Sequence, residues 1–185
     1  MSKIAKIIID VLLVIVCVVG AFFLSNWLFQ TIPVEGSSME DTIQDGDSVI
    51  LFKQGNYRAG DVVVFNTHIQ TGNGESHYIK RIIGLPGDTV EIKKDGAAYF
   101  IFVNDVKLDE TYLGGNVRAR ESDAHAKLVV PEGKFYFCGD NRLNSLDSRG
   151  GMLGDMDSIL GRVILKYDAD AGLLKDLSVV KRVGA

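Results

Sequence analysis

The chain has 185 residues, of which 46% are apolar and 24% charged, and its formal net charge at pH 7 is −4. This length suits one folded domain plus an appendage, and the composition excludes an intrinsically disordered chain. Because the charge is acidic and no basic stripe is present, we expect no nucleic-acid partner.

The first predicted element is a membrane-spanning helix over residues 7–29. Only Asp10 and Gly20 interrupt the apolar run up to Leu24, and about 20 such residues cross the hydrocarbon core of a bilayer. The alternative is a cleaved signal peptide, but the apolar run continues past the small residues that would precede a cut.

Basic residues flank this segment unevenly. Lys3 and Lys6 precede it, and the next basic residue is Lys53. Because positive charge is enriched on the cytoplasmic side, we expect residues 1–6 in the cytoplasm and the remainder outside, as in a single-pass protein of the cell membrane.

Short apolar runs separated by glycine-containing turns predict β-strands in the rest of the chain. The expected strands cover residues 48–52, 61–65, 78–83, 89–93, 97–103, 134–138 and 162–167. The predicted fold class is mainly β, with curled antiparallel sheets or a partly open barrel after one N-terminal transmembrane helix. Polar, irregular sequence at residues 104–130 predicts a small cap inserted between core parts at 30–103 and 131–185.

The cysteines and histidines give no sign of a disulfide or a metal site. Cys17 lies in the membrane segment and Cys138 in a predicted strand, so we expect them not to pair. CxxC, HExxH and clustered His/Cys patterns are missing from the sequence, and we expect neither a metal nor another cofactor.

Three sequence runs are difficult to explain by folding alone. They are GSSMEDT at 36–42, YIKRIIGLPGD at 78–88 and GDNRLNSLDSR at 139–149. A serine hydroxyl attacks a carbonyl only when a base takes its proton, and a neutral lysine amine can be that base. Ser38 and Lys80 are therefore the candidate nucleophile and base.

A lysine base must be uncharged. At the usual pKa of about 10.4, only roughly one lysine in 2,500 is neutral at pH 7. Burial among apolar groups lowers the pKa of a lysine, and Lys80 has Ile79, Ile82 and Ile83 as neighbours. The alternative is a salt-bridged lysine on the protein surface.

Other nucleophiles and bases fit less well. His77 and Lys80 are three positions apart, so on a regular strand they face opposite sides, whereas Tyr78 shares the face of Lys80. A Ser–His–Asp triad through His77 is therefore not expected. Ser37 rivals Ser38 only by adjacency, and we expect it to be exposed or to bond within a turn.

Taken together, the three runs resemble those of bacterial type I signal peptidases, which remove targeting peptides from exported proteins. The resemblance extends from Lys3 to about Tyr167. It implies a mainly β catalytic domain outside the membrane and a Ser–Lys dyad of Ser38 and Lys80. It also implies cleavage after small-x-small sequences in preproteins.

The third run is expected to support the lysine. Ser145 would hydrogen-bond the Lys80 amine and fix its direction; the alternative is a serine of a turn. Asp147 and Arg149 would form a structural ion pair, together with Arg81, that braces the lysine strand.

The oxyanion of the reaction needs hydrogen-bond donors, and the Ser38 backbone N–H is the natural candidate. Some members of the family add a hydroxyl two positions before the nucleophile. Here that position is Gly36, which leaves the second donor open.

A substrate peptide is expected to add as a strand beside the lysine strand and the segment before Ser38. The residues expected to line its pockets are Ile32, Val34, Gly36, Tyr78 and Ile79. Met39 and Ile43, together with Trp27 to Phe29, are expected to form an apolar rim that rests on the lipid bilayer.

The chain departs from the family just after Met39, where Asp41, preceded by Glu40, replaces the usual proline. Carboxylates near Lys80 would favour its charged form. A second hypothesis is therefore a paralogue that processes or assembles pilin-type surface-fibre subunits, or a non-catalytic assembly factor.

A self-cleaving SOS-type repressor would need a helix-turn-helix domain where this chain has its apolar segment. A tethered β module without a site would leave the three runs unexplained.

Overall fold

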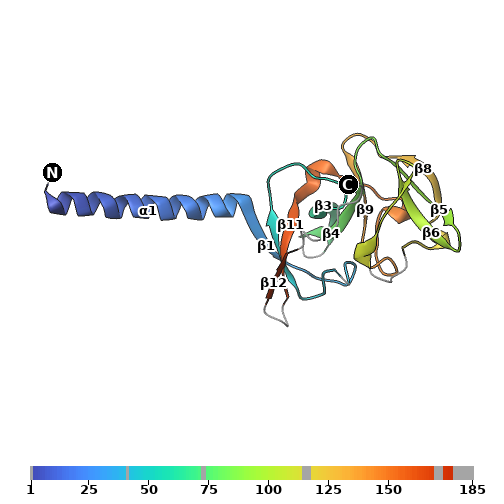
Figure 1. Ribbon diagram of the computed structural model, residues 1–185, viewed down its shortest axis with the longest axis horizontal. Helices are drawn as coiled ribbons and strands as arrows, with labels where there is room; N and C mark the ends of the chain where they lie inside the picture. The colour runs from blue at the N-terminus through green and yellow to red at the C-terminus, as the bar shows by residue number, and fades with distance from the viewer. Residues whose placement is uncertain (1, 41, 72–73, 114–117, 169–172, 177–185) are drawn as a thin grey trace.

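The computed structural model describes residues 2–40, 42–71, 74–113, 118–168 and 173–176. Helix α1 (Lys3–Leu28) extends away from a β domain and leads directly into strand β1 (Phe29–Pro33) (Figure 1). None of its residues is buried, and it is long and apolar enough to cross a membrane. Lys53 Nζ donates to the Asn26 carbonyl at 2.6 Å and ties the end of the helix to the domain.

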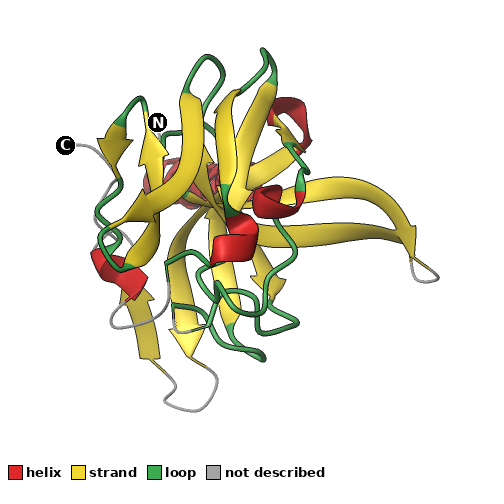
Figure 2. Cartoon of the chain, turned by 90° about the vertical axis from the view of Figure 1, so that its right-hand side faces the viewer, coloured by secondary structure: helices red, strands yellow, loops and turns green. Residues whose placement is uncertain are grey.

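The domain contains two antiparallel sheets that do not close into a barrel (Figure 2). Within the described residues the larger sheet has eight strands, in the order β1-β2-β11-β3-β4-β9-β10, with β12 paired to β11. Beyond β1, its strands are β2 (Ser48–Phe52), β3 (Val62–Thr71), β4 (Gly74–Gly84), β9 (Lys134–Cys138), β10 (Gly154–Asp155), β11 (Ile159–Asp168) and β12 (Leu173–Asp176).

The smaller sheet has the order β7-β6-β5-β8 and lies at the end of the domain remote from α1 (Figure 1). Its strands are β5 (Thr89–Asp95), β6 (Ala98–Val103), β7 (Val106–Lys107) and β8 (His125–Val129). Short 3₁₀ helices are η1 (Thr111–Leu113), η2 (Glu121–Asp123), η3 (Ser148–Gly150) and η4 (Met156–Ser158). The described part of residues 104–130 thus supplies β7, η1, η2 and β8, and its strands flank the β5–β6 hairpin.

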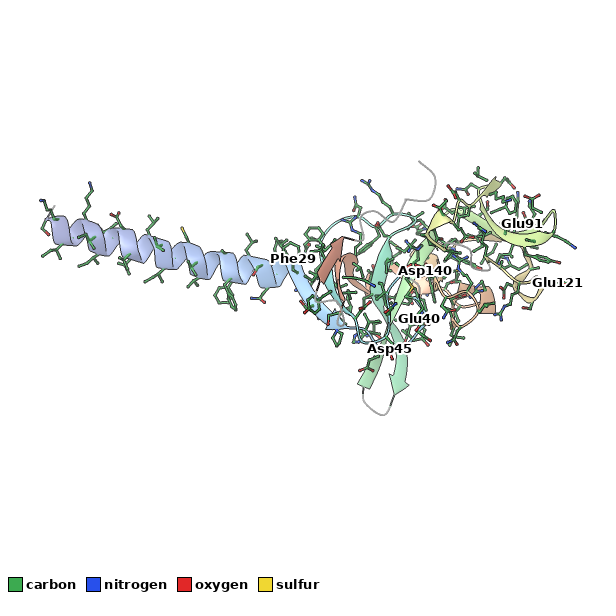
Figure 3. All side chains as sticks on the ribbon, turned by 60° about the horizontal axis from the view of Figure 1, so that its bottom comes forward. Phe29, Glu40, Asp45, Glu91, Glu121 and Asp140 are labelled. Carbon is green, nitrogen blue, oxygen red and sulfur yellow. The ribbon has the colours of Figure 1, made fainter. Side chains whose placement is uncertain are left out.

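The mainly β fold class and the seven predicted strands are confirmed. They correspond to β2, β3, β4, β5, β6, β9 and β11. Strands β3 and β4 run longer than predicted because they continue into a hairpin that projects from the sheet (Figures 2 and 3). Strand β8 was not predicted, since four of its five residues are exposed and no apolar alternation marks it.

An apolar core anchors the segment that carries Ser38. Met39 and Ile43 are fully buried and pack with residues of β2, β3 and β11. The predicted apolar rim of Met39 and Ile43 on the bilayer is therefore wrong, because both side chains point into the protein. Their burial instead fixes the position of the adjacent serine.

Strand β4 has one partially free edge. Its pairing with β9 begins at Arg81, opposite Cys138, and ends at Gly84, while its other edge pairs with β3. Within the described residues, the segment of β4 before Arg81 therefore has no β9 partner.

Candidate active site

Ser38 and Lys80 meet at the free edge of strand β4, directly before the pairing with β9 begins at Arg81. Ser38 lies in a tight turn closed by a hydrogen bond from Glu40 N to Ser37 O at 3.2 Å. Lys80 Nζ lies 2.6 Å from Ser38 Oγ and 3.0 Å from the Ile79 carbonyl oxygen. The amine also sits 4.9 Å from the centre of the Tyr78 ring. The geometry allows a proton to pass directly between the hydroxyl and the amine.

Burial shifts the protonation of this amine. Lys80 is only 4% exposed, and desolvation lowers its pKa from 10.5 to about 8. The carboxylates of Asp147 and Asp140 act in the opposite direction, because they favour the charged form. About one amine in ten is then neutral at pH 7. The alternative of a salt-bridged surface lysine does not apply, since Lys80 is buried and its recorded bonds are to Ser38 and Ile79.

The loop of residues 139–149 holds the turn of the nucleophile from one side. Asn141 N donates to the Ser38 carbonyl at 3.0 Å, and Asn141 Nδ2 donates to the Ser37 carbonyl at the same distance. Asn144 Nδ2 donates to Ser37 Oγ at 2.8 Å. Ser37 is therefore held by its side chain and by its backbone.

Ser145 lies in this loop without the bond to Lys80 that the sequence predicts. Its Oγ is buried and has no hydrogen-bond partner among the described residues. The Ser145 hydroxyl makes a small contribution to lowering the pKa of the nearby Asp147 carboxyl. Its geometry is nevertheless not that of a hydrogen bond to this carboxylate. A buried hydroxyl without a partner is costly.

Asp147 and Arg149 form the expected ion pair. Arg149 Nε and Asp147 Oδ1 are 2.8 Å apart, and both side chains are buried. Although burial raises the pKa of the Asp147 carboxyl, the hydrogen bonds and charge of Arg149 outweigh it and lower the pKa overall. Arg149 also pairs with Asp123 at 3.0 Å, which connects this loop to η2.

Arg81 is not part of that pair, which corrects the prediction. Its guanidinium binds Asp140 through Nε at 2.8 Å and Nη2 at 2.5 Å, and both residues are almost fully buried. Asp140 also accepts a 2.6 Å hydrogen bond from Thr42 Oγ1. The residue after the lysine is thereby connected to the loop of the serine. Figure 3 places Asp140 in the middle of the domain, between Phe29 at the helix junction and Glu91 on the smaller sheet.

A second buried arginine extends this network, and sequence reasoning missed it. Arg142 pairs with Glu110 at 2.6 Å, and neither side chain is exposed. Tyr112 lies between the two arginines: the Arg81 guanidinium stacks 4.0 Å from its ring centre, and Arg142 donates to its hydroxyl at 3.2 Å. The signal that could have found it is the density of charged residues in the run of residues 139–149, where four of eleven residues are charged.

The residues expected to line substrate pockets differ in their access. Gly36 is exposed, and Ile32, Tyr78 and Ile79 are half-buried. Val34 is only 4% exposed and belongs to the core around Met39, so it does not reach a bound peptide in this state.

Of the two acidic residues that depart from the family, Glu40 accepts a 3.4 Å hydrogen bond from Asn141 and is not a cause of the pKa shift of Lys80. Asp41 lies outside the described residues.

Gly139 permits the close packing of this site, and replacing it with alanine is expected to damage it. A Cβ there would lie 2.4 Å from the Ser38 carbonyl oxygen and 2.3 Å from Ser145 Oγ. Because the first contact is with backbone, Gly139→Ala should lower the free energy of unfolding by about 1–3 kcal/mol and reduce peptide cleavage. Gly150→Ala is the matched control, since nothing lies within 4 Å of its Cβ position. Equal stability of the two variants in urea unfolding would contradict the role of Gly139 in close packing.

The described residues contain no group of three or more His, Cys, Asp or Glu side chains that could hold a metal ion. Cys17 and Cys138 are free.

Comparison with known proteins agrees with the three motifs. Residues 5–167 match the family described as signal peptidase, peptidase S26. Signal peptidase I of Bacillus licheniformis is 38% identical over 150 residues, which cover 75% of this chain and 76% of that protein. Signal peptidase IB of Staphylococcus aureus is 36% identical over 177 residues, with coverage of 86% and 85%.

A solved structure of a signal peptidase I from Enterococcus faecalis covers 59% of this chain and 97% of its own, at 29% identity and a TM-score of 0.45. With a family match over most of its length and relatives well above 30% identity, the chain belongs to the signal peptidase family S26 and is a serine peptidase.

Proposed function

We propose that the protein is a membrane-bound endopeptidase that removes signal peptides from exported preproteins through a Ser38–Lys80 dyad. The observation that supports this most directly is the 2.6 Å contact between Lys80 Nζ and Ser38 Oγ, with the amine buried and its pKa lowered to about 8. Family membership supplies the class of reaction.

In the first step Ser38 Oγ attacks the scissile carbonyl carbon while neutral Lys80 takes the hydroxyl proton. The carbonyl oxygen becomes an oxyanion, which the Ser38 backbone N–H stabilises. Lys80, now charged, gives its proton to the departing amine as the peptide bond breaks. Water then attacks the acyl-enzyme with Lys80 again as base. The bond between the acyl carbon and Ser38 Oγ breaks, Lys80 returns the proton to Oγ, and the signal peptide leaves with a new carboxylate.

Ser145 orients Lys80 during this cycle. Its buried hydroxyl has no recorded partner, and Lys80 must turn from Ser38 towards the leaving amine. A hydrogen bond from the amine to Ser145 Oγ would guide that movement. Asp147, Arg149 and Arg81 keep structural roles, because their charges are paired with one another or with Asp140.

The substrate adds as an extended strand along the free edge of β4 before Arg81. Tyr78 and Ile79 face opposite sides of this strand, since Tyr78 packs with the cluster around Phe65 and Ile79 with the cluster around Met39. Alternate side chains of the peptide would meet different walls, which suits the reading of small-x-small sequences.

Helix α1 anchors the enzyme in the bilayer, with residues 1–6 in the cytoplasm and the β domain outside. Lys3 and Lys6 lie at the N-terminal end of the helix, and its last turn has no basic residue. This asymmetry supports the orientation, in which the site would face the side where exported preproteins emerge.

Cleavage of a preprotein in detergent tests the function, with the new N-terminus identified by mass spectrometry. Because the base must be neutral, kcat/KM should rise about tenfold per pH unit below pH 8 and level off above it, as Lys80 loses its proton. Ser38→Ala serves as the blank at every pH. Cleavage by that variant at the rate of the natural enzyme, or a flat pH profile, would refute the dyad.

A further inference from the structure

The oxyanion of this reaction has one backbone donor in view, and position 36 cannot add another. Gly36 has no side chain, and its φ is +95°, a conformation that strains residues with a Cβ. Restoring a hydroxyl at this position would therefore distort the turn that presents Ser38.

In this turn, the Ser37 hydroxyl accepts a hydrogen bond but, within the described residues, has no recorded acceptor for its own hydrogen. Ser37 Oγ accepts a 2.8 Å hydrogen bond from Asn144 Nδ2, and an amide N–H₂ can only donate. The hydroxyl hydrogen must therefore point elsewhere, and among the described residues no acceptor is recorded for it. Ser37 is half-buried rather than fully exposed, and its carbonyl is fixed by Asn141 Nδ2 at 3.0 Å.

The position of this hydroxyl along the chain brings it close to the backbone donor. A seryl Oγ is separated by only four covalent bonds from the backbone nitrogen of the next residue, which here is that of Ser38. A carbonyl oxygen bound at the Ser38 N–H therefore lies near the Ser37 side chain as well. Two converging donors are the usual composition of an oxyanion hole.

We propose that the Ser37 hydroxyl is the second oxyanion donor and that Asn144 is the positioning residue that aims it. By donating to Ser37 Oγ, the Asn144 amide leaves the hydroxyl hydrogen free for the substrate oxygen. This assignment rests on the proposed function, because it needs Ser38 as the nucleophile.

Kinetics of Ser37 variants test the assignment. Loss of one oxyanion donor lowers kcat by about 10²–10³-fold in a serine peptidase. Ser37→Ala should therefore lower kcat by about 10²-fold with little change in KM, whereas Ser37→Thr, which keeps the hydroxyl, should retain most of the activity. Asn144→Ala should lower kcat by less than Ser37→Ala does.

Binding of a transition-state mimic separates this role from a structural one. A peptide aldehyde that ends in alanine forms a hemiacetal with Ser38, whose oxygen occupies the oxyanion position. Its affinity should fall in Ser37→Ala by a factor similar to that for kcat, while the affinity for the product peptide should not change. A parallel loss for both ligands would indicate a distorted turn and overturn the proposal.

Gln44→Ala is the matched control, since Gln44 is exposed and close to the same turn. It should cleave like the natural enzyme, and thermal unfolding should show that all variants are folded. If Ser37→Ala keeps kcat within twofold while Ser38→Ala is inactive, this proposal fails and the proposed function stands. If Ser38→Ala still cleaves, the proposed function fails first.

Discussion

Replacing Lys80 with methionine is expected to reduce preprotein cleavage by at least about 10³-fold and, at the same time, to stabilise the fold. Activity is lost because, among the described residues, Lys80 is the base recorded in contact with the Ser38 hydroxyl. Stability is gained because methionine has a similar length and no charge to desolvate. A pKa that falls from 10.5 to about 8 on folding corresponds to about 3 kcal/mol of unfavourable charge burial.

The cost of burying the Lys80 charge makes the free energy of unfolding depend on pH. Between pH 8 and 10.5 the unfolded chain keeps the Lys80 proton and the folded chain has released it. The free energy of unfolding contributed by Lys80 therefore rises with pH across this window, and below pH 8 the full cost of the buried charge is present. Lys80→Met should remove this rise, which urea unfolding at pH 7 and pH 10 would measure.

A second buried lysine provides the contrast. Lys166 is 6% exposed and lies 2.9 Å from the Asp47 carboxylate. Lys166→Met leaves that buried carboxylate without its cation, so it should destabilise the fold by about 3–5 kcal/mol. If Lys80→Met also destabilised the protein at pH 7, burial of the Lys80 charge would not be unfavourable to folding as predicted.

The strands could be predicted because they depend on local pattern. The pairing of Ser38 with Lys80, which are 42 positions apart, was expected from the chemistry of the motifs and their resemblance to those of signal peptidases. Strand β4 alternates with period two, so Tyr78 and Lys80 share a face while His77 does not. A hairpin signal is equally local, and Lys94-Asp95-Gly96 lies where β5 turns into β6. Strand β8 was not predicted because most of its residues are exposed. Its pairing with β5 produces no alternation of apolar and polar residues in its sequence.

The partners of buried charges could not be predicted, because they are chosen by the tertiary fold. Arg81 and Asp140 are 59 positions apart, and the sequence offered Asp147 as an equally plausible partner. The same limit applies to Ser145, whose buried hydroxyl has no recorded bond to Lys80. Glu110 likewise carried no sign in the sequence of its burial against Arg142.

Breaking the Arg81–Asp140 pair should produce a large loss of stability. In Asp140→Asn the guanidinium of Arg81 stays buried without a carboxylate, and such a change costs about 3–5 kcal/mol. Glu91→Gln is the matched control, because its partner Lys93 is 44% exposed and a surface pair contributes only about 0–1 kcal/mol. Urea unfolding of the two variants would compare these losses.

The same substitution should also change catalysis in a direction that instability alone does not give. Asp140 is one of the carboxylates that raise the pKa of Lys80, so its neutralisation should shift the rise of kcat/KM to a pH below 8, measured where the variant is folded. The double variant Arg81→Met/Asp140→Leu should be more stable than Asp140→Asn, because it removes both charges and leaves neither unpaired. If it were the less stable of the two, the network would be held by packing around the arginine rather than by its charge. An unshifted pH profile in Asp140→Asn would mean that Asp140 braces the serine loop through Thr42 without acting on the lysine.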